Sequence, residues 1–453
     1  MIIKKNNKLI SNGLILSLPG ILSIFISLIS IPIHLNIAGA ENYGNYLIFH
    51  FLLTISLIFN LGIGKSMVIS MNNFPKKSKA IAYQGLKYTF MISLFILIIF
   101  IVLPIIKEGI LFSFFKINSI FEYFTICIIS TIFYVSLESI FQGNQKFKSL
   151  SFYNFIFFSL SLSLPSLTLL YNNNLTLDQL FLVSTVLKIF TILVMILIIL
   201  SKNLILKSTD KILINNLKKN SRWLTLNAIL IQFYDLFDKY LIKIFMGPIA
   251  LATYSIPQQL TGKLSIFSKG FSAFLLPLLS KKKITNNDFN LTIKIFLKLI
   301  PILIFLLFPL YSVLLKFWLG ENFNEDILVL SKIFSLSVVF SCASHILITK
   351  FEASQTLKKN LKFELLVMPF FLLILYYFTS GGYSLVYIGS IILAKETILL
   401  FLRLNILQKE VNKLFNYYIY SILFIFMLYL SLNNQNLFYI FEILMLLSLV
   451  KND

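Results

Sequence analysis

Charged residues are scarce in this chain of 453 residues: Asp, Glu, Lys and Arg together make up 13%, whereas hydrophobic residues make up 58%. Soluble domains carry about 25% charged residues, so the composition excludes a soluble fold. Histidine, with 3 residues, is also rare. The sequence shows no zinc-ligand spacing, no glycine-rich phosphate loop and no serine, histidine and aspartate set. It therefore predicts no metal, no cofactor and no enzyme.

Cysteine occurs only twice, at Cys127 and Cys342, and both positions lie inside apolar stretches. We interpret them as small core residues and not as a disulfide. A short basic lead precedes the first apolar run, which lacks a small-residue cleavage site. We therefore expect that run to be the first membrane span and not a signal peptide.

Apolar runs long enough to cross about 30 Å of hydrocarbon as helices recur along the whole chain. Helices are required because a spanning backbone must satisfy its own hydrogen bonds. The sequence thus predicts an all-α integral membrane protein with about 14 transmembrane helices, about 12 of them in the core. The predicted spans are 14–35, 43–69, 84–106, 119–141, 150–170, 179–200, 223–246, 251–279, 291–318, 327–350, 361–379, 383–404, 415–432 and 436–450.

The net charge of +21 is distributed unevenly among the predicted loops. Loops on one side carry 23 Lys and Arg residues, whereas those on the other side carry only Lys107 and Lys116. The positive-inside rule then predicts that both termini are cytoplasmic. We interpret the basic surplus as a topology signal first and as attraction to anionic membrane lipids second, and we expect no nucleic-acid partner.

The hairpin from Trp223 to Lys283 places polar residues at bilayer depth. Its second leg carries a polar stripe at steps of four and three, with Lys263 beside it: Gln258, Gly262, Ser265, Lys269 and Ser272. Its first leg adds Tyr234, Asp235, Asp238 and Lys239. Ionisable groups in hydrocarbon are costly unless they face a partner or a wet cavity. The hairpin therefore predicts one wall of a hydrophilic cavity within a helix bundle.

Four lysines within the spans have no obvious partner within one turn: Lys65, Lys188, Lys263 and Lys269. We predict that these lysines, together with Gln258 and Ser265, line the cavity and bind substrate. The alternative is that each lysine snorkels to an interface or pairs with an acid on another helix.

Three further residues are candidates for coupling to H+ or Na+. Asp235 and Lys239 are spaced i, i+4 with the acid first, so they form either a self-neutralised pair or a charge relay. Asp238 is less readily explained by such a pair and is the better candidate.

An internal repeat relates the two halves of the chain. At an offset of 208 residues it pairs Gly39 with Gly247, Tyr46 with Tyr254, and Gly62 with Gly270, and at an offset of 210 it pairs 141–145 with 351–355. It predicts an N-terminal six-helix lobe at 1–200, a basic cytoplasmic linker at 201–222, a C-terminal six-helix lobe at 223–405 and an appended helical pair at 406–453. Parallel repeats of this kind place the substrate path between the lobes. His50 maps to Gln258 and either lines the cavity or, as we favour, is a hydrogen-bonded packing residue.

Several short motifs occur in a consistent order: Ala38–Gly44, Asn60–Gly64, Phe141–Phe147, Asp238–Ile242 followed by Gly247, Tyr254 and Pro277, and Trp318–Gly320. In this order they resemble the polysaccharide flippases of the multidrug/oligosaccharidyl-lipid/polysaccharide exporter superfamily, over residues 10 to 405.

The resemblance implies a V-shaped, MATE-like bundle in the bacterial cytoplasmic (inner) membrane. Such a protein carries an undecaprenyl-diphosphate-linked oligosaccharide from the cytoplasmic to the periplasmic leaflet by alternating access, for O-antigen or capsule synthesis. The implied partners are this lipid-linked oligosaccharide, membrane lipids, H+ or Na+, and a polysaccharide polymerase.

Three other functions stay open from the sequence. The extra C-terminal pair looks more like the peptidoglycan-precursor flippases of the same superfamily. A multidrug or metabolite exporter would favour acids over lysines in its cavity. A membrane glycan polymerase or glycosyltransferase is disfavoured because the non-cytoplasmic loops are short.

Overall fold

The fold is known from a computed structural model that describes residues 2–54, 56–102, 118–207, 211–281, 289–290, 292–293, 300–301, 304, 307–354 and 356–407. All regular elements in these ranges are helices. The N-terminal half contains α1 (Ile2–Thr54), α2 (Ser56–Phe59), α3 (Ile63–Asn73), η1 (Pro75–Lys77), α4 (Ser78–Val102), α6 (Asn118–Gly143), α7 (Phe147–Asn154), η3 (Phe155–Leu160), α8 (Ser161–Thr168) and α9 (Leu177–Ser201). The C-terminal half contains α10 (Lys211–Gly262), η4 (Lys263–Ser265), α11 (Ile266–Ser280), α13 (Tyr311–Leu319), η5 (Gly320–Asn322), α14 (Glu325–Ala353), α15 (Leu357–Ser380) and α16 (Leu385–Ile406).

The protein is a multi-pass membrane protein. Within the described ranges, nine helical segments are long and apolar enough to cross a membrane. Two of them, Ile15–Phe59 and Asn220–Ser280, are 45 and 61 residues long, which is far more than the ~20 residues that one crossing needs. Each of these long segments therefore supplies two of the predicted spans.

A glycine kink divides each of the two long segments. Gly39 has φ 82° and ψ 163°, and Gly247 has φ 88° and ψ 174°, so both lie outside the helical region. An L side chain disfavours such positive φ values, whereas glycine adopts them without steric cost. The nearly identical dihedral angles, 208 residues apart, agree with the predicted internal repeat.

The predicted span 43–69 is interrupted, which the hydrophobic pattern did not indicate. Leu61 and Gly62 have φ values of 49° and 62°, and α3 begins after them. Asn60 stabilises this break because its side-chain oxygen accepts a hydrogen bond from Gly64 N at 2.9 Å and its amide donates to Ser136 Oγ at 3.0 Å. The span 251–279 is likewise divided by the 3-10 turn η4.

Three predicted segments cannot be compared in full. The span 291–318 is described only in part, and the spans 415–432 and 436–450 lie outside the described residues. The second half of the predicted linker, from Lys211, is helical and continues into the first span of the C-terminal half as α10. The proposed domain boundaries therefore stay a prediction.

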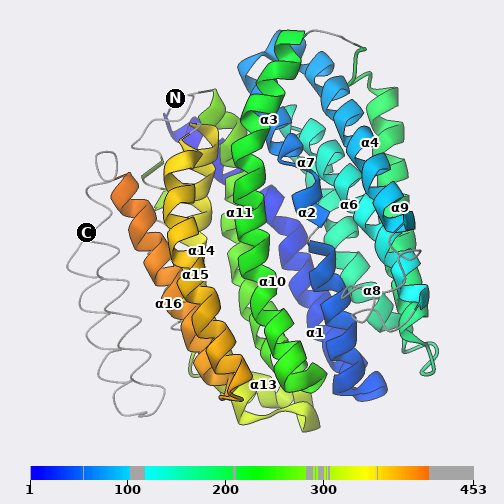
Figure 1. Ribbon diagram of the computed structural model, residues 1–453, viewed down its shortest axis with the longest axis vertical. Helices are drawn as coiled ribbons and strands as arrows, with labels where there is room; N and C mark the ends of the chain where they lie inside the picture. The colour runs from blue at the N-terminus through cyan, green and yellow to red at the C-terminus, as the bar shows by residue number, and fades with distance from the viewer. Residues whose placement is uncertain are drawn as a thin grey trace.

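The helices form two lobes that lie side by side, with α1 through α9 on one side and α13 through α16 on the other (Figure 1). We call these the N-lobe and the C-lobe, and we assign α10 and α11 to the C-lobe. Helices α10 and α11 pack both on α14 and on α1, so they form the C-lobe face of the interface. Cys127 and Cys342 are buried and unpaired, which confirms their interpretation as core residues.

The lobes touch at both ends of the bundle. We call the end with the turns at 74–77 and 144–146 the basic end, and the end with Gly39 and Gly247 the kink end. At the kink end, a Cβ on Gly44 would lie 2.2 Å from the carbonyl oxygen of Pro248, so the two backbones are in close contact. At the basic end, Gln142 of α6 donates a hydrogen bond to the carbonyl oxygen of Ala273 at 2.6 Å.

Candidate functional site

Two neighbouring cavities lie within the bundle. The N-lobe cavity has a volume of about 650 Å³ and is lined by α1, α6, η3 and α9, together with η4 and α11. The C-lobe cavity has a volume of about 360 Å³ and is lined mainly by α10, α14 and α16. Four residues line both cavities: Phe51, Thr54, Gly262 and Lys269. The two spaces therefore adjoin at the lobe interface.

The N-lobe cavity is basic. Three lysines, Lys188, Lys263 and Lys269, line it together with a single carboxylate, Glu138. Lys188 is 6% exposed, and its ammonium nitrogen lies 5.4 Å from the centre of the Phe157 ring. No acid among the described residues forms an ion pair with any of these three lysines. The cavity therefore concentrates positive charge inside the bundle.

Lys263 is the first residue of η4, and Lys269 lies in the first turn and a half of α11, so both line this cavity from adjacent segments. Lys263 Nζ donates a hydrogen bond to Ser23 Oγ of α1 at 2.8 Å. Lys269 is exposed toward both cavities, and within the described chain its ammonium group has no hydrogen-bond or ion-pair partner. Four residues of the predicted polar stripe line the C-lobe cavity together, namely Gln258, Gly262, Ser265 and Lys269, whereas Lys263, which lies beside the stripe, lines the N-lobe cavity.

Lys65 does not line either of the two cavities. Its ammonium group pairs with Glu352 of α14 at 2.5 Å, and the same carboxylate oxygen accepts a hydrogen bond from Asn227 at 3.1 Å. The prediction that Lys65 is a cavity residue thus needs correction, since the structure follows the alternative of pairing with an acid on another helix. This pair joins α3 of the N-lobe to α14 of the C-lobe near the basic end.

The three ion-coupling candidates line the C-lobe cavity, but their pairing differs from the i, i+4 pattern. Lys239 Nζ contacts Asp238 Oδ1 at 3.2 Å and the backbone carbonyl of Asp235, not its carboxylate. Asp238 is 1% exposed and also accepts a hydrogen bond from Tyr254 Oη at 2.6 Å. Asp235 is exposed to the cavity, and its carboxylate has no partner in the described part of the chain. Asp235, and not Asp238, is therefore the carboxylate left available.

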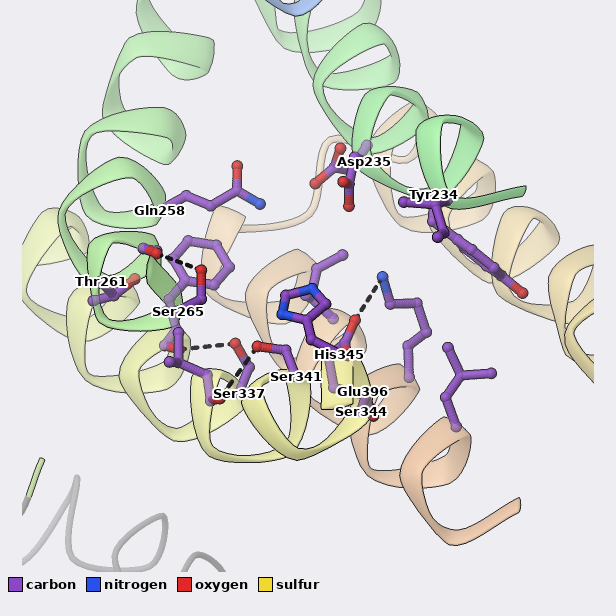
Figure 2. A pocket seen from close by; sticks show the side chains of 18 of the residues that line it. Tyr234, Asp235, Gln258, Thr261, Ser265, Ser337, Ser341, Ser344, His345 and Glu396 are labelled. Atoms are coloured by element: carbon purple, nitrogen blue, oxygen red, sulfur yellow. Dashed lines mark hydrogen bonds and ion pairs between the residues drawn. The ribbon is translucent and has the colours of Figure 1, made fainter. Parts of the chain in front are cut away.

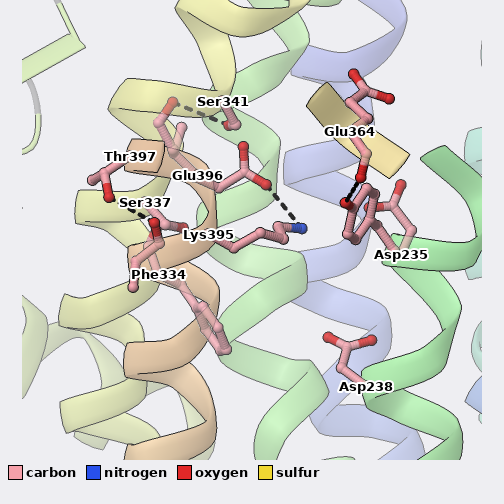
Figure 3. Close-up of polar contacts among 12 residues, drawn as sticks. Asp235, Asp238, Phe334, Ser337, Ser341, Glu364, Lys395, Glu396 and Thr397 are labelled. Carbon is pink, nitrogen blue, oxygen red and sulfur yellow. Dashed lines mark hydrogen bonds and ion pairs between the residues drawn. The ribbon is translucent and has the colours of Figure 1, made fainter. Parts of the chain in front are cut away.

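Sequence reasoning missed a cluster of three side chains on α15 and α16, namely Asn360, Glu364 and Arg403. Arg403 donates to Glu364 Oε1 at 2.6 Å and to Asn360 Oδ1 at 3.2 Å, and Asn360 in turn donates to Glu364 Oε1 at 2.7 Å. The adjacent residues Lys395 and Glu396 pair at 3.0 Å (Figure 3). Two features of the sequence could have indicated this cluster. Asn360 and Glu364 are spaced i, i+4, and Arg403 is the single arginine of its span.

His50 also departs from expectation. It lines the N-lobe cavity, its buried Nε2 has no hydrogen-bond partner among the residues that the structure describes, and its ring lies 4.6 Å from that of Tyr46. The favoured interpretation as a hydrogen-bonded packing residue is therefore wrong for this nitrogen. His50 and its repeat counterpart Gln258 line neighbouring cavities, one in each lobe.

The fold and the site define the class of the protein: an all-α, two-lobed membrane protein with charged cavities at the lobe interface. Such an interior is the usual location of a transport path in a multi-span protein, because charged groups are expensive elsewhere in a bilayer.

Comparisons with known proteins agree with this class. No protein-family model matches the sequence. The chain is 25% identical over 342 residues to a Shigella flexneri protein named "Putative O-antigen transporter", and the match covers 71% of this chain and 78% of that protein.

Solved structures show the same fold. The crystal structure of a MATE protein has a TM-score of 0.68 at 14% identity and covers 90% of this chain and 97% of its own. A MOP superfamily transporter from Pyrococcus furiosus has a TM-score of 0.66 at 12% identity, with coverages of 93% and 96%. An outward-facing multidrug resistance MATE family transporter has a TM-score of 0.65 at 13% identity, with coverages of 90% and 97%. These findings confirm the MATE-like fold and the resemblance that the motifs indicated.

Proposed function

We propose that the protein is a flippase that carries an undecaprenyl-diphosphate-linked oligosaccharide from the cytoplasmic to the periplasmic leaflet by alternating access. It would act in surface polysaccharide synthesis, in the bacterial inner membrane, with both termini cytoplasmic. The likeness to a protein named as an O-antigen transporter supports this cargo class.

The basic N-lobe cavity is the observation that carries the proposal. A lipid diphosphate brings about two negative charges into the bundle, and lysines meet phosphate as mobile point charges. Lys188, Lys263 and Lys269 supply three positive charges against the one carboxylate of Glu138. A cationic drug would be repelled by this surplus, so the cavity favours an anionic cargo.

The C-lobe cavity contains the residues that we propose for coupling transport to H+ or Na+. Asp238 and Lys239 neutralise each other, whereas the carboxylate of Asp235 is free to take H+ or Na+. We therefore place any ion coupling at Asp235 first, with Asp238 and Lys239 as the groups beside it. A polysaccharide polymerase would be the natural recipient of the exported unit.

The test compares charge removal inside and outside the cavity. Lys263→Gln and Lys269→Gln should each lower transport about tenfold or more, because a hydrogen bond to a charged group contributes ~1.5–3 kcal/mol. Lys→Arg variants should keep part of the activity because they keep the charge. Lys148→Gln, at an exposed position outside both cavities, is the matched control and should transport normally.

The readout is periplasmic glycan normalised to the amount of membrane protein. Normal transport by both Gln variants would contradict the assignment of the N-lobe cavity to the cargo diphosphate.

A further inference from the structure

The C-lobe cavity differs in chemistry from the N-lobe cavity, because most of its charges are matched within its own lobe. Lys239 pairs with Asp238, Lys395 with Glu396, and Arg403 with Glu364. Each of these cations is 7% exposed or less. The two remaining charged residues that line it, Asp235 and Lys269, are of opposite sign, so little net charge is left to attract a diphosphate.

The wall of this cavity is instead rich in hydroxyl and amide groups. Ser337, Ser341 and Ser344 follow one face of α14 at steps of four and three, and they lie opposite Gln258, Thr261 and Ser265 (Figure 2). Hydroxyl groups both donate and accept hydrogen bonds, and an amide offers two donors and one acceptor. A surface of this kind suits a neutral ligand that carries many hydroxyl groups of its own.

Two of these groups are left without partners. Ser344 is 2% exposed and lines the cavity, and its Oγ has no hydrogen-bond partner in the described part of the chain. A buried hydroxyl without a partner costs about 1–3 kcal/mol. The side-chain amide of Gln258, which also lines the cavity, forms no hydrogen bond within the described chain. Both groups therefore offer binding capacity to a ligand in this space.

The position of the cavity fixes how such a ligand relates to the diphosphate. Lys269, Phe51, Thr54 and Gly262 line both cavities, so a group held in one is adjacent to a group held in the other. The two volumes, about 650 and 360 Å³, each lie within the usual range for ligand sites.

We propose that the C-lobe cavity is a sugar subsite, which binds the sugar residue next to the diphosphate while the diphosphate lies in the N-lobe cavity. Lys269 stands at the junction, beside the bond that links the two parts. This inference rests on the proposed function, since it takes the cargo to be a lipid-linked glycan. It assigns the serine face of α14 and Gln258 to sugar recognition.

The experiment measures binding of two kinds of probe to the purified full chain in lipid nanodiscs. One probe is undecaprenyl diphosphate without sugar. The others are undecaprenyl diphosphate carrying one glucose, one galactose or one N-acetylglucosamine. At least one sugar-bearing lipid should bind about threefold to tenfold tighter than the bare lipid, from one or two added hydrogen bonds.

The double variant Gln258→Ala with Ser344→Ala should lose this gain and keep the affinity for the bare lipid. Ser331→Ala is the matched control, because Ser331 Oγ on α14 is also buried and has no partner among the described residues, but Ser331 does not line the cavity. Lys263→Gln should weaken the binding of the bare lipid and of the sugar-bearing lipid by the same factor.

The outcomes separate the two claims. If no sugar-bearing lipid binds tighter than the bare lipid, or if the double variant weakens both kinds equally, the sugar subsite is refuted. If the bare lipid does not bind, or binds Lys263→Gln as well as the unaltered chain, the proposed function fails instead.

Discussion

The ion pair between Lys65 and Glu352 should hold the lobes together at the basic end. Lys65 is 48% exposed, whereas Glu352 is 3% exposed and has Asn227 as its second partner. The Lys65→Met change would leave a buried carboxylate without its counter-charge. Breaking a fully buried pair costs about 3–5 kcal/mol, and exposure of the lysine lowers this here to ~1–2 kcal/mol.

That energy shifts the equilibrium between closed and open basic ends by a factor of about 5–30 toward the open form. Glu352→Gln should have a smaller effect, because the amide still accepts from Asn227 and the freed lysine reaches solvent. The double change should resemble Glu352→Gln alone, since no unpaired buried charge is left.

Spin labels at Lys148 of the N-lobe and Lys359 of the C-lobe, both exposed, would report the distance across the basic end. The labels would be placed in a chain whose two buried cysteines are replaced by alanine. Lys65→Met should increase the long-distance population, whereas the exposed Lys202→Met control should not. A distance distribution unchanged by Lys65→Met, or opened more by Glu352→Gln, would refute this reasoning.

Three further predictions concern stability, topology and energy. Gly39→Ala or Gly247→Ala should each destabilise the protein by about 1–3 kcal/mol, because positive φ with extended ψ is strained for alanine. Helical Gly262→Ala should not destabilise it in this way, and thermal unfolding in detergent checks both expectations. Reporter fusions after Lys79 should report cytoplasm and fusions at Asn173 periplasm, and the reverse result would overturn the proposed orientation. Export of about two negative charges across an inside-negative membrane is favourable by ~4–5 kcal/mol at 100 mV. Collapse of the membrane potential at a fixed pH gradient should therefore slow flipping. An unchanged flipping rate would exclude the membrane potential as the driving force.

Hydropathy and the internal repeat were sufficient to predict an all-α membrane bundle of two lobes, whereas its MATE-like form was implied by the resemblance of the short motifs. The repeat offset of 208 residues pairs Gly39 with Gly247, and the structure gives these two residues nearly the same backbone conformation. The break at Leu61 and Gly62 was not predictable from hydropathy. It depends on hydrogen bonds from Asn60 to a neighbouring helix, which a sequence pattern does not contain.

The candidate site was predictable in part, and the limit was the pairing of charges between helices. The structure places Lys263 at the wall of the N-lobe cavity and Lys269 at the walls of both cavities. Lys65 and Arg403 find partners on other helices, at sequence separations of 287 and 39 residues. Spacing rules reach only one or two turns along a helix, so such partners stay hidden from them.

The most direct test of the proposed flippase function is the location of the lipid-linked glycan in cells that lack this protein. Spheroplasts of a deletion strain without a redundant flippase would be treated with an impermeant sugar-modifying reagent, and labelled glycan lipid would be measured against total glycan lipid. If the protein is this flippase, the lipid-linked glycan should accumulate in the cytoplasmic leaflet, where the reagent does not reach it. Return of the unaltered gene should restore labelling of the glycan by the reagent. Normal periplasmic access in the deletion strain would contradict the proposed flippase function.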